Sequence, residues 1–184
     1  MLFDKKSMSS KTLNKIAKRL FANCKKDEYW GKGGAGMMFT CSEDDTVLLL
    51  LRASWVDQPN TWGVAGGGIG EDWNDTPIDE PITNDAIFLT TARKEVREEC
   101  GSLPPKFNNS QIINKTEYED CGFRYVTFIA DITLAQKEKW ELASNDGETD
   151  QFLWVKKSTL KKTSKPGGKS LHFGVKYTLS QTTI

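Results

Sequence analysis

The feature that most constrains how this chain can fold is an uninterrupted run of aliphatic residues, Val47–Leu51. A strand with one face in solvent alternates apolar and polar residues, whereas a strand covered on both faces is apolar throughout. The run therefore predicts a central strand at 46–52, with structure packed against both faces of its sheet. The acidic turn at 42–45 predicts a hairpin with a preceding strand at 37–41.

Apolar periodicity and turn residues predict the elements of the remaining chain. Further strands are expected at 111–118, 123–132 and 151–157, and helices at about 84–100, 134–142 and 171–179. The glycine-rich residues 31–36 are expected to form a flexible link, and residues 59–70 a turn-rich segment. Because strands and helices alternate without a repeat or a linker, residues 1–184 are expected to form a single α/β domain, a sandwich with a mixed β-sheet between helices.

The N-terminal segment, at about 9–25, has an apolar stripe at helical spacing, with lysines mostly on its other faces. This pattern predicts an amphipathic helix that packs on the domain. Contact with a membrane surface or with RNA is the alternative for a basic helix of this kind.

Charge and cysteine content exclude several classes of protein. Lys and Arg together number 25, as do Asp and Glu, so net charge favours neither a nucleic-acid partner nor a membrane surface. The charge is unevenly placed, since residues 1–26 hold eight basic side chains and one acidic, and residues 71–99 hold nine acidic and three basic. The four cysteines form no CxxC pair, which favours reduced thiols in a cytoplasmic protein over zinc ligation or disulfides. No apolar run is long enough to span a bilayer.

The acidic charge includes three carboxylates on one face of the helix expected at about 84–100. Glu95, Glu98 and Glu99 have i, i+3 and i+4 spacing, and like charges at i,i+4 cost roughly 0.2–0.5 kcal/mol in an isolated helix. A divalent cation would reverse the sign of that interaction, and carboxylate oxygens suit Mg²⁺ or Mn²⁺. A solvated acidic surface is the alternative interpretation of the helix taken alone.

Two segments in order along the chain resemble the Nudix box of the MutT-like hydrolases. Residues 94–101, KEVREECG, resemble its helical half, and residues 61–69, TWGVAGGGI, resemble the strand and glycine loop that open it. The resemblance extends to 34–52, 123–128, 146–155 and 171–176. It implies a Nudix-type α/β/α sandwich, to which the N-terminal helix is an addition, and a box at about 66–102.

The box departs from the family pattern at several positions. Lys94 stands where the family has arginine, and Gly70 and Ala86 stand where it has glutamates. An inserted loop at about 71–85 separates the two halves of the box, and Glu71 or Glu80 in that loop is a candidate for the lost carboxylate.

The resemblance implies a metal site for Mg²⁺ (or Mn²⁺) formed by Glu95, Glu98, Glu99 and the Gly67 carbonyl. Lys94 would orient Glu98, with which it shares i,i+4 spacing, although an ordinary surface pair is the alternative. Glu148, in a loop before a strand, is the candidate general base. Glu95 and an acid of the inserted loop are its rivals.

Four further residues are candidates with a structural alternative for each. Arg52 is expected to reach substrate phosphates, or else to form a structural ion pair. Trp62 is a candidate for stacking on a nucleobase, as is Phe123, with core packing as the alternative for both. His172, the one histidine of the chain, is expected to be structural.

The predicted function is that of a Mg-dependent pyrophosphohydrolase. It would cleave a phosphoanhydride bond in a nucleoside diphosphate linked to another group, so the predicted partner is a small nucleotide. Two alternatives stay open: a nucleotide-sensing or scaffold module without turnover, and a hydrolase of RNA 5′ ends or caps. The identity of the nucleotide and the oligomeric state are left open by the sequence.

Overall fold

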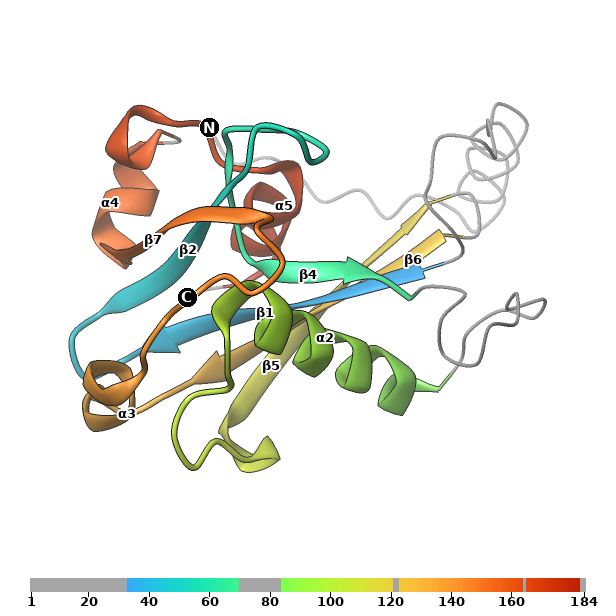
Figure 1. Ribbon diagram of the computed structural model, residues 1–184, viewed down its shortest axis with the longest axis horizontal. Helices are drawn as coiled ribbons and strands as arrows, with labels where there is room; N and C mark the ends of the chain where they lie inside the picture. The colour runs from blue at the N-terminus through green and yellow to red at the C-terminus, as the bar shows by residue number, and fades with distance from the viewer. Residues whose placement is uncertain (1–32, 70–83, 121–122, 164, 183–184) are drawn as a thin grey trace, which may run out of the picture.

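The computed structural model describes residues 33–69, 84–120, 123–163 and 165–182. Its centre is one seven-stranded sheet with the order β3-β2-β1-β6-β5, in which β4 pairs with β1 and β7 pairs with β2 (Figure 1). The strands are β1 (Gly33–Cys41), β2 (Thr46–Arg52), β3 (Trp62–Gly63), β4 (Ala65–Gly68), β5 (Ile112–Asp120), β6 (Phe123–Asp131) and β7 (Thr149–Lys156). The helices are α2 (Asp85–Cys100), α3 (Leu134–Lys139), α4 (Lys157–Lys162) and α5 (Phe173–Gln181), with short 3-10 turns at Asn109–Gln111 and Pro166–Gly168.

The sheet is mixed, as predicted. β1 runs parallel to β6 and antiparallel to β2 and β4, and the other strand pairs are antiparallel. The hairpin expected across the acidic turn is present, with Thr40 opposite Val47. The first half of β1 pairs with β4 and its end pairs with β2, so two neighbouring strands share one edge of β1.

Strand β2 is covered on both faces, which confirms the prediction from its aliphatic run. Leu48 and Leu50 belong to the core on the α2 side of the sheet, together with Phe88 and Val96 of that helix. The side chains between them point the other way, into the core on the α5 side. That second core consists of Met38, Val47, Leu49, Leu51, Trp62, Ile129, Val155, Leu171 and Val175.

Helix α2 begins and ends near the predicted residues. The Asn84 side chain caps its start by accepting a hydrogen bond from the Ala86 N–H at 2.9 Å, and Gly101 follows its last residue with a φ of +81°. Figure 1 shows the helix lying along β1 and β4, against which it packs. Its C-terminal half therefore lies beside the glycine strand β4.

The expectation of a flexible link at 31–36 is wrong for residues 33–36, which form the start of β1. The glycines serve close packing there, because a Cβ on Gly34 would lie 2.7 Å from the Tyr125 ring and 2.8 Å from the Gly67 carbonyl oxygen. The turn-rich segment at 59–70 likewise contains β3 and β4, which pair with β2 and β1.

Two helices near the C-terminus differ from their predicted bounds. The helix expected at 134–142 ends at Lys139, and the helix expected at 171–179 runs instead over Phe173–Gln181. The short helix α4, directly after β7, was not predicted. Its six residues are too few for periodicity to separate it from the strand before it.

Several predicted features lie outside the described residues. These are the N-terminal helix at 9–25, Gly70, and the inserted loop apart from Asn84 and Asp85, including Glu71 and Glu80. Within the described ranges, no helix combines the length and apolar character needed to cross a bilayer.

Candidate active site

A cavity of about 880 Å³ opens beside the C-terminal half of α2. Ligand pockets typically enclose about 300–1,000 Å³, so the cavity has room for a nucleotide. Its walls come from α2, the β3–β4 strands, the loop after β2, strands β5 and β6, the loop before β7, and the start of α5. Of the predicted site residues, it brings together Arg52, Gly67, Lys94, Glu95, Glu98 and Glu148.

Glu95 projects from α2 onto the backbone of the glycine strand β4. A Cβ on Gly67 would lie 2.6 Å from Glu95 Oε2 and 2.9 Å from Oε1, so only glycine leaves space for the carboxylate at this place. The Gly67 backbone and the Glu95 carboxylate thus line the cavity as neighbours. The two segments that resemble the Nudix box thus lie side by side.

Glu99 lies behind this wall, with only 3% of the residue exposed. Its Oε1 accepts a hydrogen bond from the Gly66 N–H at 2.7 Å, and its Oε2 accepts one from the Thr149 hydroxyl at 3.3 Å. Glu99 therefore ties α2 to β4 and β7. This structural connection was not predicted. The metal-binding role expected for Glu99 from the sequence stays a prediction.

Lys94 lies at the outer edge of the carboxylates. Its Nζ is 3.4 Å from Glu98 Oε2 and 3.8 Å from Glu95 Oε1, and its side chain is 55% exposed. The ammonium group thus contacts both carboxylates, as an orienting residue would. Its exposure also fits the alternative of a surface pair, since solvent weakens such interactions.

Glu148 enters the cavity from the loop before β7, together with Asp146. Asp146 Oδ1 accepts hydrogen bonds from the Glu148 N–H at 2.9 Å and from the Ser144 hydroxyl at 3.0 Å. The Glu148 carbonyl accepts a hydrogen bond from the Ala53 N–H at 2.8 Å, which fastens this loop to the end of β2. Asp146 was not predicted as a site residue. The Asp-Gly turn sequence that begins two residues before Glu148 is the feature that indicates it.

The electrostatics of the wall follow from crowded, partly buried acids. Burial raises the pKa of Glu95 to about 7; Lys94 opposes this shift, and Glu98, Glu148 and Asp146 add to it. Burial also raises the pKa of Glu99 to about 8, against the Gly66 hydrogen bond. Carboxylates with such pKa values are poorly compensated as anions by the protein alone.

The acids offer hard oxygen donors of the kind that Mg²⁺ and Mn²⁺ take. In donor chemistry, these residues fit a divalent cation. Among the described residues, however, no three His, Cys, Asp or Glu side chains are already arranged to hold a metal ion.

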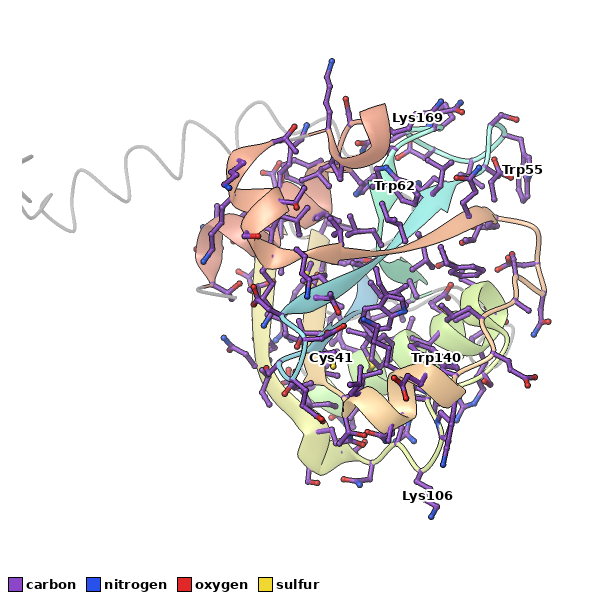
Figure 2. The ribbon with its side chains drawn as sticks, turned by 90° about the vertical axis from the view of Figure 1, so that its left-hand side faces the viewer. Cys41, Trp55, Trp62, Lys106, Trp140 and Lys169 are labelled. Atoms are coloured by element: carbon purple, nitrogen blue, oxygen red, sulfur yellow. The ribbon has the colours of Figure 1, made fainter. Side chains whose placement is uncertain are left out.

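Arg52 and Trp62 occupy different environments. Arg52 lines the cavity, and its Nε donates to the Asp57 carbonyl at 2.7 Å. Trp62 is 4% exposed, belongs to the core on the α5 side, and donates from Nε1 to the Pro166 carbonyl at 2.7 Å. Figure 2 shows Trp62 beside the turn that carries Lys169. It does not line the cavity, which corrects its expected contact with substrate in favour of core packing.

Aromatic residues also line the cavity and form its aromatic wall. Phe123, Tyr118 and Tyr125 come from the sheet, and Phe173 and Tyr177 come from α5. His172 caps α5, because its Nδ1 accepts a hydrogen bond from the Gly174 N–H at 3.0 Å, which agrees with the structural role expected for it. Burial, followed by the charge of Arg52, lowers the pKa of His172 to about 4.

Solved structures with the same fold are Nudix proteins. The MutT NUDIX hydrolase from Burkholderia pseudomallei is 17% identical, with a TM-score of 0.53 over 84% of this chain and 100% of that one. The NUDIX domain of Shewanella oneidensis NrtR, crystallised with ADP ribose, is 15% identical, with a TM-score of 0.51 over 95% and 96%. This chain has the Nudix hydrolase fold. RenU, a Nudix hydrolase from M. smegmatis, is a further match at 20% identity and a TM-score of 0.51, over 85% and 91%.

A curated protein is similar to part of this chain in sequence. The Mycobacterium tuberculosis protein named "Putative 8-oxo-dGTP diphosphatase 3" is 30% identical over 126 residues, which cover 62% of this chain and 52% of that protein. The chain thus spans about half the length of the curated relatives it matches. No protein-family model matches the chain. The prediction of a Nudix-type α/β fold is confirmed.

Proposed function

We propose that this Nudix-fold chain is a pyrophosphohydrolase that requires Mg²⁺ or Mn²⁺. Its substrate would be a nucleoside diphosphate linked to another group, and the bond cleaved would be a phosphoanhydride. The observation that carries the proposal is the acidic wall of the cavity, where Glu95 lies on the Gly67 backbone beside Glu98 and Glu148.

The acidic wall supports this chemistry because a polyphosphate is itself an anion. A cavity lined by several carboxylates would repel that ligand unless cations lay between the two. A bound divalent cation supplies the compensating charge and Lewis acidity, and it lowers the pKa of a water molecule that it binds. Burial, and then the neighbouring acids, raise the pKa of Glu95, so a nearby cation would stabilise its anion.

The remaining cavity residues can be given roles in the reaction. Glu148 would accept the proton of the attacking water while the water oxygen forms a bond to phosphorus and the anhydride P–O bond breaks. The leaving phosphate takes the electron pair of the broken bond. Arg52 would pair with a phosphate oxygen, and Lys94 would hold the Glu98 carboxylate in place.

The named relatives support the substrate class. One is described as an 8-oxo-dGTP diphosphatase and another was crystallised with ADP ribose, and both ligands contain phosphoanhydride bonds between phosphates on a nucleoside. A sensor that binds without turnover is the rival function, but the presence of Glu95, Glu98 and Glu148 in one cavity favours hydrolysis. Action on RNA 5′ ends would concern the basic N-terminus, which lies outside the described residues.

The test is hydrolysis of a nucleotide panel with Mg²⁺, with Mn²⁺ and with EDTA, followed by product analysis. The panel should include nucleoside triphosphates, ADP-ribose, dinucleoside polyphosphates and a 5′-triphosphorylated RNA. Metal-dependent release of a nucleoside phosphate is the expected result. Tight nucleotide binding by calorimetry without turnover on any member would favour the sensor instead.

The role of Glu148 is tested by Glu148→Gln. Loss of the general base should reduce kcat about 100-fold or more, while metal affinity stays near wild type, because the α2 carboxylates remain. Glu141→Gln is the control, since Glu141 is exposed and does not line the cavity. An unchanged kcat and pH profile in Glu148→Gln would transfer the role to Glu95.

A further inference from the structure

Large hydrophobic side chains are exposed at three places in the described part of the chain. They are Trp55 at 65%, Ile113 at 62% and Phe173 at 48%. Two of the three, Trp55 and Phe173, line the catalytic cavity. Exposed aromatic surface beside a cavity is typical of a binding site, because the rings gain by burial against a ligand.

Trp55 is carried by a loop that the structure holds in place at both ends. The Arg52 N–H donates to the Thr61 carbonyl at 2.9 Å, and the Asn60 N–H donates back to the Arg52 carbonyl at 3.0 Å. Gln58 and Asn60 have positive φ values of 47° and 58°, which are uncommon for non-glycine residues. The loop therefore presents the indole from a defined backbone, at the outer edge of the molecule (Figure 2).

Phe173 is the first residue of α5, and its neighbours fix its orientation. Its ring contacts that of Tyr118 edge to face, with centroids 5.3 Å apart and planes at 81°. The Phe173 N–H donates to the Gln58 side-chain oxygen at 3.4 Å, which joins the start of α5 to the loop of Trp55. The two exposed rings thus stand on adjacent, connected walls of one cavity.

We propose that Trp55 and Phe173 form an aromatic clamp that stacks on the nucleobase of the substrate. The inference rests on the proposed function, because it takes the ligand to be a nucleotide whose phosphates lie at the acidic wall. The proposed clamp recognises the base through two side chains whose ring faces carry no hydrogen-bonding group. Neither the indole nor the phenyl face distinguishes one purine from another.

Recognition by stacking has a consequence for specificity. Every nucleobase has a π face, so stacking tolerates different bases, and the larger purine rings gain more contact than pyrimidines. The clamp therefore favours purine over pyrimidine nucleotides and separates adenine from guanine weakly. It makes no contribution to binding a ligand that lacks a base.

The experiment measures dissociation constants by calorimetry for AMP, CMP and ribose 5-phosphate with wild type, Trp55→Ala, Trp55→Phe and Phe173→Ala. Each alanine variant should bind AMP roughly 5- to 150-fold more weakly, the range expected for loss of one stacking contact. CMP should lose less, ribose 5-phosphate should be unchanged, and Trp55→Phe should recover most of the AMP affinity. Ile113→Ala is the matched control, since it removes an equally exposed hydrophobic side chain outside the cavity.

Two outcomes would overturn the clamp. AMP binding within twofold of wild type in both alanine variants would show that the rings do not contact the base. Equal weakening of AMP and ribose 5-phosphate, or a drop in Tm not seen for Ile113→Ala, would show that the rings support the fold instead. These failures differ from failure of the proposed function, in which wild type itself would neither bind nor hydrolyse any nucleotide of the panel.

Discussion

The acidic and the aromatic walls of the cavity are built in opposite ways. On the acidic wall, the glycine backbone positions the carboxylates: Glu95 lies on Gly67, and Glu99, buried behind the wall, accepts a hydrogen bond from Gly66. Phe173 of the aromatic wall, and Trp55 on the loop joined to it, line the cavity with much of their surface exposed. The difference indicates that the first wall is suited to holding charge at fixed positions, and the second to accepting a flat ligand.

The largest expected effect separates the two possible roles of Glu99. In Glu99→Gln the amide oxygen can still accept from Gly66 and the amide nitrogen can donate to the Thr149 hydroxyl, so the fold should survive. Only the negative charge is lost. If that charge helps to hold the catalytic metal, turnover should fall by roughly 1,000-fold or more, about 4 kcal/mol at the transition state.

Initial rates at saturating Mg²⁺, with Tm as the measure of folding, check this prediction. Glu141→Gln again serves as the control. A folded Glu99→Gln protein with wild-type kcat would show that Glu99 acts only through its structural hydrogen bonds and not as a metal ligand. The acidic wall would then depend on Glu95, Glu98 and the 146–148 loop.

The second prediction concerns the aromatic wall, since His172 caps the helix that carries Phe173. The folded-state pKa of His172 is lowered to about 4, whereas an unperturbed histidine has a pKa of about 6.5. The unfolded chain therefore binds the proton more tightly. The free energy of unfolding is fully retained above about pH 6.5 and falls as pH drops toward about 4, by about 3 kcal/mol at most.

Urea unfolding at a series of pH values would measure this loss, and the chain's one histidine makes its NMR titration unambiguous. His172→Asn is the control, because asparagine caps helices without titrating. Glu95 and Glu99 also titrate, in the opposite sense, but they act equally in both proteins, so the difference between the two curves isolates His172. Parallel curves over pH 4–6.5 would contradict the prediction.

The two walls also differ in how far the sequence could predict them. The acidic wall was predictable because its residues are close together in the sequence. Glu95, Glu98 and Glu99 share a helix face by spacing alone, and the glycines at 66–68 indicate a close approach of the backbone. The central strand was equally predictable, since an aliphatic run with no polar alternation requires two covered faces. The two cores on either side of β2 could therefore be predicted from the five residues of the aliphatic run.

The aromatic wall depends on tertiary placement, which periodicity does not reveal. Trp62 was the tryptophan expected to meet substrate, yet the isolated bridge from Trp62 to Leu171 and the turn at Pro166 bury it. Trp55, only seven residues earlier, lies on a loop that turns toward α5. Which of two nearby tryptophans faces the cavity is decided by chain segments more than 100 residues away.

A third prediction tests the Glu95–Gly67 contact on the acidic wall. In Gly67→Ala the new Cβ would lie 2.6 Å from Glu95 Oε2, which is the free end of a flexible side chain. The fold can therefore adjust at low cost by moving the carboxylate, so Tm should change little. Turnover should fall roughly 10- to 100-fold, because catalytic groups displaced by about an ångström lose much of their effect.

The control for this change is Glu141→Gln, since Glu141 is exposed and does not line the cavity. It should keep both Tm and kcat near wild type. A Gly67→Ala protein with full activity would show that the Glu95 carboxylate need not lie on the glycine backbone. A large loss of Tm would instead show that the contact is structural.

The smallest expected effect belongs to Lys94, which contacts both Glu95 and Glu98 from an exposed position. Because solvent-exposed ion pairs contribute at most about 1 kcal/mol, Lys94→Ala should reduce kcat only about fivefold or less. Lys94→Arg should match or exceed wild type, since a guanidinium fork can hold the carboxylates at two points where an ammonium holds them as a point charge. Titrating the rate with Mg²⁺ for the three proteins distinguishes orientation from simple charge. An orienting role predicts that Lys94→Arg keeps the wild-type kcat and that Lys94→Ala does not. An ordinary surface pair predicts three indistinguishable curves, and that result would show that Lys94 has no part in catalysis.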